Sequence, residues 1–348
     1  MKTWSLFGAL VSSLLFTAFG YAVTIDTVPI GNPGNPGDTR YDPTGVGSVG
    51  YGFRMARTEV TNAQYVEFLN AVAGADSYGV FFATGVQETL QGIVRSGSPG
   101  SYNYSVKPAA LGGTYTYGDK PVAFVSSGDA MRFVNWLHNG QPAGAQNAST
   151  TEDGEYTLNG ATSSAALAAI TRNAGARWWF PSIQEWYKAA YHKNDGVTGN
   201  YWDYPTATNI DPNNNLPTSD TGNSVNYWNG TFTTGNFDYP LTDAGAYMLS
   251  ASPYGTFDMG GNLAEWTEDA YLDSDLGFVR RVSGGSWGSS SIFPTFQLRA
   301  QYSGGGLVDP SAHRAIVGFR VASSVPEPAT LYLGGMAVVG IWRRRRRN

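Results

Sequence analysis

The residues of this sequence best suited to chemistry are oxygen donors gathered between positions 257 and 265. Asp258 and Glu265 supply carboxylates, and the glycines between them leave the backbone free to turn the carbonyls of Gly261 and Leu263 toward a shared centre. Calcium takes six to eight hard oxygen ligands from carboxylates, amides and backbone carbonyls. The segment therefore predicts a Ca²⁺ site. The alternative is a simple turn in which Glu265 forms an ion pair.

Redox chemistry has few residues to draw on. The chain contains no cysteine and only three histidines, His138, His192 and His313. They lie in different segments and lack the H-x-x-x-H or two-histidine-one-carboxylate spacing of iron sites, so iron is not expected, although folding could still assemble distant ligands. His138 and His192 lie near the ends of expected helices, where a positive charge is favoured. No catalytic residue is predicted.

Three helices are expected to position these residues. Each begins with a capping pair and continues with apolar residues at helical spacing. The caps and apolar stripes are Thr61 with Gln64 before Tyr65, Phe68, Leu69 and Val72; Ser126 with Asp129 before Ala130, Phe133, Val134 and Leu137; and Ser182 with Glu185 before Trp186, Ala189 and Ala190.

The composition predicts an irregular, loop-rich fold held by large side chains. Charged residues are 14% of the chain, against about 25% in an average soluble domain. Glycine is abundant at 44 residues, and there are 10 Trp, 21 Tyr and 17 Phe. Apart from Lys2 and the five arginines near the C-terminus, 16 basic residues face 27 acidic ones. Nucleic acid is not an expected partner, because binding it requires clustered Lys and Arg.

Both ends of the chain carry targeting features. Residues 1–22 are predicted to be a signal peptide, with Lys2, an apolar run over 6–19 and the cleavage site Gly20-Tyr21-Ala22; a buried N-terminal helix is the alternative. Residues 325–348 contain Pro326-Glu327-Pro328, an apolar run and five arginines. This order resembles a PEP-CTERM sorting signal, which implies transient anchoring in the inner membrane and removal by an exosortase. The alternative is a plain tail anchor.

Between the ends, residues 23–50 are expected to form an extended arm, and residues 51–324 one domain. The polar stretch 201–245 shows no helical period and predicts either structured loops or a disordered insert. Its aromatic residues favour structure, because disordered segments are poor in them.

Six motifs resemble those of the formylglycine-generating enzyme, or sulfatase-modifying factor, family. In chain order they are Arg57 to Tyr65 (R-T-E-V-T-N-A-Q-Y), Lys120 to Trp136 (opening K-P-V), Phe180 to Trp186 (F-P-S-I-Q-E-W), Gly261 to Trp266 (G-N-L-A-E-W), Gly284 to Trp287 (G-G-S-W) and Gly318 to Val321 (G-F-R-V). The resemblance implies an α+β class: an irregular single domain related to C-type lectins, with little regular secondary structure.

The resemblance also bears on metals. Members that make formylglycine hold Cu(I) between two thiolates after G-G-S; Ser289 and Pro294 stand at those positions, so copper is not expected. Members bind calcium at positions matching Asp258, Gly261, Leu263 and Glu265. A second family calcium site implies Asn226 and Tyr227 as ligands, with Asp238 and Tyr239 as further candidates, although the loop length differs there. Arg320 is expected to pair with a buried carboxylate.

Two functions follow as hypotheses. The favoured one is an exported, non-catalytic, calcium-binding module of the cell surface or extracellular matrix, with exopolysaccharide or surface proteins as possible partners. The alternative is a metal-dependent oxidoreductase of the non-haem iron type that uses histidine and carboxylate ligands. The lack of cysteine and the scattered histidines favour the first.

Overall fold

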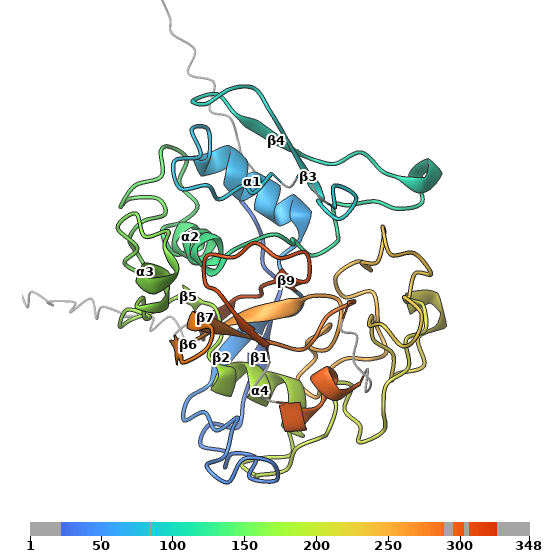
Figure 1. Ribbon diagram of the computed structural model, residues 1–348. Coiled ribbons are helices and arrows are strands. Elements are labelled where there is room, and N and C mark those ends of the chain that lie inside the picture. Colours follow the sequence, from blue (N-terminus) through green and yellow to red (C-terminus); the bar gives the residue numbers. More distant parts are fainter. Residues whose placement is uncertain (1–21, 84, 86, 289–294, 303–305, 326–348) are drawn as a thin grey trace, which may run out of the picture.

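Two four-stranded sheets form the centre of the structure, a computed structural model that describes residues 22–83, 85, 87–288, 295–302 and 306–325 (Figure 1). The first sheet has the order β1-β2-β10-β5 and is antiparallel throughout. The second has the order β8-β7-β6-β9, in which the β6–β9 pair is parallel. A separate hairpin, β3–β4, lies beside α1 at one edge of the molecule (Figure 1).

The strands are short except for the central pair β6 and β7. Their bounds are β1 (Thr27–Ile30), β2 (Phe53–Ala56), β3 (Ile93–Ser96), β4 (Asn103–Val106), β5 (Trp178–Trp179), β6 (Ala264–Asp273), β7 (Gly277–Ser283), β8 (Gly306–Val308), β9 (Val317–Gly318) and β10 (Ala322–Ser324). The first sheet therefore joins strands from the two ends of the domain, since β10 pairs with β2.

All three predicted helices are confirmed, together with their capping boxes. They are α1 (Asn62–Val72), α2 (Ser127–His138) and α4 (Ile183–Tyr191), with N-caps at Thr61, Ser126 and Ser182. In each, the cap side chain accepts from the N3 backbone N–H, and the N3 side chain returns the bond. A short fourth helix, α3 (Ser164–Ala168), was not predicted. The remaining helical turns in the described residues are 3₁₀: Leu111–Gly113, Pro217–Ser219, Phe296–Leu298 and Ala300–Tyr302.

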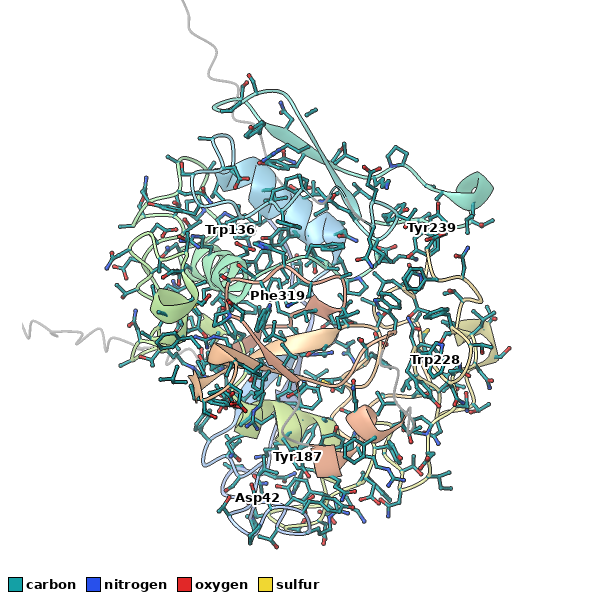
Figure 2. All side chains as sticks on the ribbon, viewed as in Figure 1. Asp42, Trp136, Tyr187, Trp228, Tyr239 and Phe319 are labelled. Atoms are coloured by element: carbon teal, nitrogen blue, oxygen red, sulfur yellow. The ribbon has the colours of Figure 1, made fainter. Side chains whose placement is uncertain are left out.

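The stretch 201–245 forms structured loops, as its aromatic residues predicted. It contains no α-helix or strand, yet Tyr204 and Tyr227 are fully buried within it. Trp228 and Tyr239 belong to these loops, which form one side of the molecule, whereas Phe319 lies at its centre (Figure 2). The Phe319 ring packs on Phe133 of α2 with centroids 5.4 Å apart. The core therefore joins the helices to the central strands through large rings.

The segment expected to be an extended arm, residues 23–50, contains β1, which pairs with β2 in the first sheet. No helix in the described part of the chain has the length and apolar character needed to cross a membrane. The predicted signal peptide, apart from its last residue, and the sorting tail after Val325 lie outside the described residues.

Candidate functional site

The parallel pairing of β6 and β9 determines the polar centre of the molecule. It places Glu265 opposite Gly318, two residues before Arg320. A side chain at Gly318 would meet both the Leu263 side chain and the Val122 carbonyl at 2.8 Å. Glycine in the G-F-R motif is therefore required by the close approach of β9 to its neighbours, and this approach brings Arg320 to Glu265.

Arg320 and Glu265 form a buried, two-point ion pair. The Arg320 Nε donates to Glu265 Oε2 at 2.6 Å, and Nη2 donates to Oε1 at 2.5 Å. The two side chains are 0% and 1% exposed. Trp186 of α4 donates a further hydrogen bond from Nε1 to Oε2 at 2.8 Å. The prediction that Arg320 pairs with a buried carboxylate is confirmed.

Two more acids surround this pair. Asp258, buried at a positive φ of 56°, accepts from the Gly245 N–H through Oδ2 at 2.5 Å. Glu59 is also buried, and neither of its carboxylate oxygens has a hydrogen-bond partner. Burial raises the pKa of Asp258 to about 6, and burial beside Asp258 and Glu265 raises the pKa of Glu59 well above its usual value. Three carboxyl groups thus lie near the single Arg320 guanidinium.

The net negative charge of these three acids and Arg320 suits a calcium ion, whereas the directions of their free oxygens suit it less well. Once Glu265 is paired with Arg320, a divalent cation would balance the charge of the two other acids, Asp258 and Glu59. Both carboxylate oxygens of Glu59 lack a hydrogen-bond partner. However, Arg320 and Trp186 occupy three of about four lone-pair directions of Glu265. In the described part of the chain, no three His, Asp or Glu side chains are grouped to hold a metal. Calcium binding by Asp258, Gly261, Leu263 and Glu265 stays a prediction. It requires the backbone carbonyls of Gly261 and Leu263 to supply the ligands that Glu265 cannot.

The loop of the first predicted calcium set packs directly on the second set. Gly261 has φ of 80°, and an added Cβ would lie 2.3 Å from the Asn226 carbonyl oxygen. The Asn262 N–H donates to that same carbonyl at 2.7 Å. The Asn226 side chain donates from Nδ2 to Asn262 Oδ1 at 3.0 Å. The structure therefore brings Asn226 to the 258–265 loop, a neighbourhood that sequence spacing did not indicate.

The other residues of the second set have separate surroundings. The Tyr227 carbonyl accepts from the Thr233 hydroxyl at 3.3 Å. Asp238 is exposed, and the Tyr239 ring packs edge-on against Tyr115 with centroids 5.0 Å apart. This second calcium set also stays a prediction.

The three histidines lie in three separate places, each with partners of its own. His138 Nδ1 lies 2.7 Å from Glu155 Oε2; His192 Nδ1 lies 2.8 Å from the Tyr254 hydroxyl, with Nε2 2.9 Å from the Thr198 carbonyl; and His313 Nε2 lies 2.9 Å from Asp129 Oδ2. His138 ends α2 and His192 caps α4, as the sequence predicted. Among the described residues the fold brings no two of these histidines together at a metal site.

A cavity of about 500 Å³ lies beside Gly285 and Ser286 of the G-G-S motif. Its walls are mainly aliphatic side chains from the second sheet and from the segment leading into β9: Val279, Val282, Leu307, Val308, Ile316 and Val317. Among the described residues, the polar side chains that line it are Ser286, Gln297, Asp309 and Arg314. A concave, largely apolar site of this size with a few polar groups is typical of small-molecule sites.

The two charged residues of the cavity differ in how fully they are partnered. Asp309 Oδ1 accepts from the Ser311 N–H at 2.8 Å, the Ser311 hydroxyl at 2.8 Å and the Ser164 hydroxyl at 2.6 Å. Arg314 is exposed. Its guanidinium forms no ion pair with any residue that the structure describes. Sequence reasoning missed Arg314, because nothing in its neighbours distinguishes it from an ordinary surface arginine.

The positions that correspond to the family's copper-binding cysteines, Ser289 and Pro294, lie outside the described residues. Their chemistry is nevertheless fixed by the sequence, since the chain contains no cysteine that could supply a thiolate. Among the described residues, Ser286 is the part of this motif that reaches the cavity, with Gly285 beside it.

Comparison with known proteins places these features in a family. Residues 28–325 match the sulfatase-modifying factor enzyme 1-like domain, and residues 324–347 match the PEP-CTERM protein-sorting motif. No curated protein matches the chain. Similar solved structures include Treponema denticola variable protein 1 (17% identity, TM-score 0.50, covering 88% of this chain and 97% of that one) and CarF (19%, 0.49, 87% and 99%). PvdO from Pseudomonas aeruginosa is also similar (16%, 0.44, 86% and 92%).

Proposed function

Because the chain belongs to the sulfatase-modifying factor enzyme 1-like domain family through residues 28–325, we propose that it is a non-catalytic binding module of that family, acting at the cell surface or in the extracellular matrix. Its α+β fold, with few helices and several small sheets, agrees with the predicted class. The PEP-CTERM motif marks an exported protein that is processed by sorting machinery of the exosortase type. The binding role and its partners, whether exopolysaccharide or surface proteins, are the proposal.

One observation carries the proposal: the described residues that line the cavity at the G-G-S motif are mainly aliphatic and include no histidine. Relatives that oxidise cysteine need two soft thiolates after this motif, and this chain has no cysteine at all. What remains at the motif is a concave apolar surface with Ser286 at its wall. Such a surface can bind a ligand, and Asp309, the one carboxylate among the described residues that line it, already accepts hydrogen bonds from Ser164 and Ser311.

Calcium binding is a second part of the proposal. The support is the excess of buried acid around Arg320, where Glu59 and Asp258 add to the carboxylate of Glu265. A bound calcium ion would offset the repulsion between these acids and would fasten the 258–265 loop to β6. The ion would stabilise the fold and would have no catalytic role.

The test uses the full-length chain, produced in an exosortase-containing host and collected in its mature form. Elemental analysis should find calcium without stoichiometric iron or copper. Stoichiometric iron that is lost on substitution of His138, His192 or His313 would instead support the oxidoreductase alternative and overturn the non-catalytic proposal.

A binding assay complements the metal analysis. Leu307→Trp should fill the cavity and weaken sedimentation with isolated envelope and matrix material, because Leu307 lines it from the short strand β8. Leu216→Trp is the matched control, since Leu216 is an exposed leucine of the loops that does not line the cavity. Equal retention of both variants and the wild type would count against the cavity as the binding surface.

A further inference from the structure

We propose that the cavity beside Ser286 binds a small ligand that combines an apolar body with one anionic group, and that Arg314 recognises the anion. The inference rests on the proposed binding function and adds the chemical class of the ligand.

The walls favour an apolar ligand body. Val279, Val282 and Leu307 come from the paired strands β7 and β8, and Ile316 comes from the segment that leads into β9. At the cavity, Leu276 is 61% exposed and Ile316 is 40% exposed. Contact with an apolar ligand would remove this surface from water at about 25 cal/mol per Å². A sugar would place most of its hydroxyl groups against the aliphatic walls, where they would lose their hydrogen bonds to water.

The charges favour one anionic group. Asp309 already accepts three hydrogen bonds from Ser164 and Ser311. By contrast, Arg314 forms no ion pair with any described residue, although its positive charge is near enough to Asp309 to help lower the pKa of that carboxyl. A guanidinium offers a planar fork of donors that matches a singly charged carboxylate or sulfonate. A multiply charged ligand would need further cations, and Arg314 is the only cationic side chain among the described residues that line the cavity.

The experiment compares two fluorescent probes that share the same aromatic body. Anilinonaphthalene sulfonate carries a sulfonate, and phenylnaphthylamine lacks it. The wild type should bind the sulfonate probe saturably with one-to-one stoichiometry. Arg314→Gln should weaken the sulfonate probe about tenfold and leave the neutral probe within about twofold, and Arg314→Lys should fall between. Raising the salt concentration should weaken only the charged probe.

Control variants separate binding in the cavity from recognition of the anionic group by Arg314. Leu307→Trp should weaken both probes, because it removes the space for their shared body. Lys193→Gln, at a cation outside the cavity, should change neither. The melting temperature of each variant is measured and must match that of the wild type. Probe bound by partly unfolded protein is then not mistaken for binding in the cavity. Competition by octanoate and by a naphthalene carboxylate, with octanol as the neutral control, then distinguishes alkyl from aryl bodies.

The outcomes are distinct. If Leu307→Trp leaves both probes bound as in the wild type, they bind elsewhere and the cavity itself fails as a binding site. If Leu307→Trp blocks both probes while Arg314→Gln weakens them equally or not at all, the binding function stands and the anionic ligand class is wrong.

Discussion

Arg320 donates to both carboxylate oxygens of Glu265 across 55 residues of sequence, with neither side chain reaching solvent. The pair joins β6 to the segment between β9 and β10, and further hydrogen bonds from the Arg320 guanidinium reach the carbonyls of Ala56 and Phe257. Three separate parts of the chain therefore meet at one guanidinium. This contact joins the G-N-L-A-E-W motif to the G-F-R-V motif.

Breaking this pair should destabilise the protein strongly. Glu265→Gln removes the carboxylate that is hydrogen-bonded to the buried Arg320 guanidinium at two points and leaves only the nearby acids Asp258 and Glu59 to balance its charge, so we expect the free energy of unfolding to fall by about 3–5 kcal/mol. Urea unfolding measures the loss. Asp26→Asn is the matched control, because the Arg57–Asp26 pair is 40% and 69% exposed and should contribute less than about 1 kcal/mol. A loss for Glu265→Gln no larger than that of the control would contradict a stabilising buried pair.

Calcium should raise the melting temperature of the wild type, and Asp258→Asn should remove that gain. The asparagine keeps an acceptor for the Gly245 N–H and suits the positive φ, while it removes one charge beside Glu59. In chelator the variant should therefore be at least as stable as the wild type. A ligand at 100 times its Kd adds about 2.7 kcal/mol. Scanning calorimetry in calcium and in chelator makes the comparison, and an unchanged wild-type melting temperature would rule out the calcium prediction.

The protein should lose stability as the pH falls below about 6.5, in part because of His192. Burial lowers the pKa of His192 from 6.5. Its Nδ1 accepts from the Asn194 N–H, so Nε2 carries the proton of the neutral ring and donates to Thr198. The unfolded chain then takes up a proton at higher pH than the folded one. The stabilisation is present above 6.5 and is lost as the pH falls toward the folded pKa.

Two measurements check this pH dependence. The His192 ring proton should titrate by NMR with a midpoint below 6.5, and His192→Gln should flatten the fall in unfolding free energy between about pH 7.5 and 5.5. The comparison with the variant isolates His192 from the carboxylates and from the other two histidines. A midpoint at or above 6.5 would mean that burial does not exclude the charged ring.

The C-terminal tail should be absent from the mature protein. Mass spectrometry of protein released from the surface should show loss of the sequence after the region of Pro326-Glu327-Pro328, in keeping with the sorting motif over 324–347. Replacing these three residues by alanine should keep the tail on the protein and leave it with the membrane fraction. Mature wild-type protein that retains all five arginines would contradict processing.

The sequence by itself determined the features that depend on neighbouring residues or on composition. The helix starts at Thr61, Ser126 and Ser182 could be predicted because a capping box joins positions three residues apart. The lack of cysteine, and with it the loss of thiolate copper chemistry, is a property of composition. The C-terminal sorting motif and the family motifs are likewise contiguous stretches of the chain.

Only the tertiary structure decided which distant residues share a site. The short strands carry almost no periodic signal, so the β6–β9 pairing that brings Arg320 to Glu265 was invisible to sequence. Glu59 looked like part of a helix-opening motif, and only burial showed that its oxygens lack partners. Arg314 became a candidate binding residue only because it lines a cavity whose walls come from separate strands. Burial and long-range pairing set the environment of a charge, and neither is encoded in local spacing.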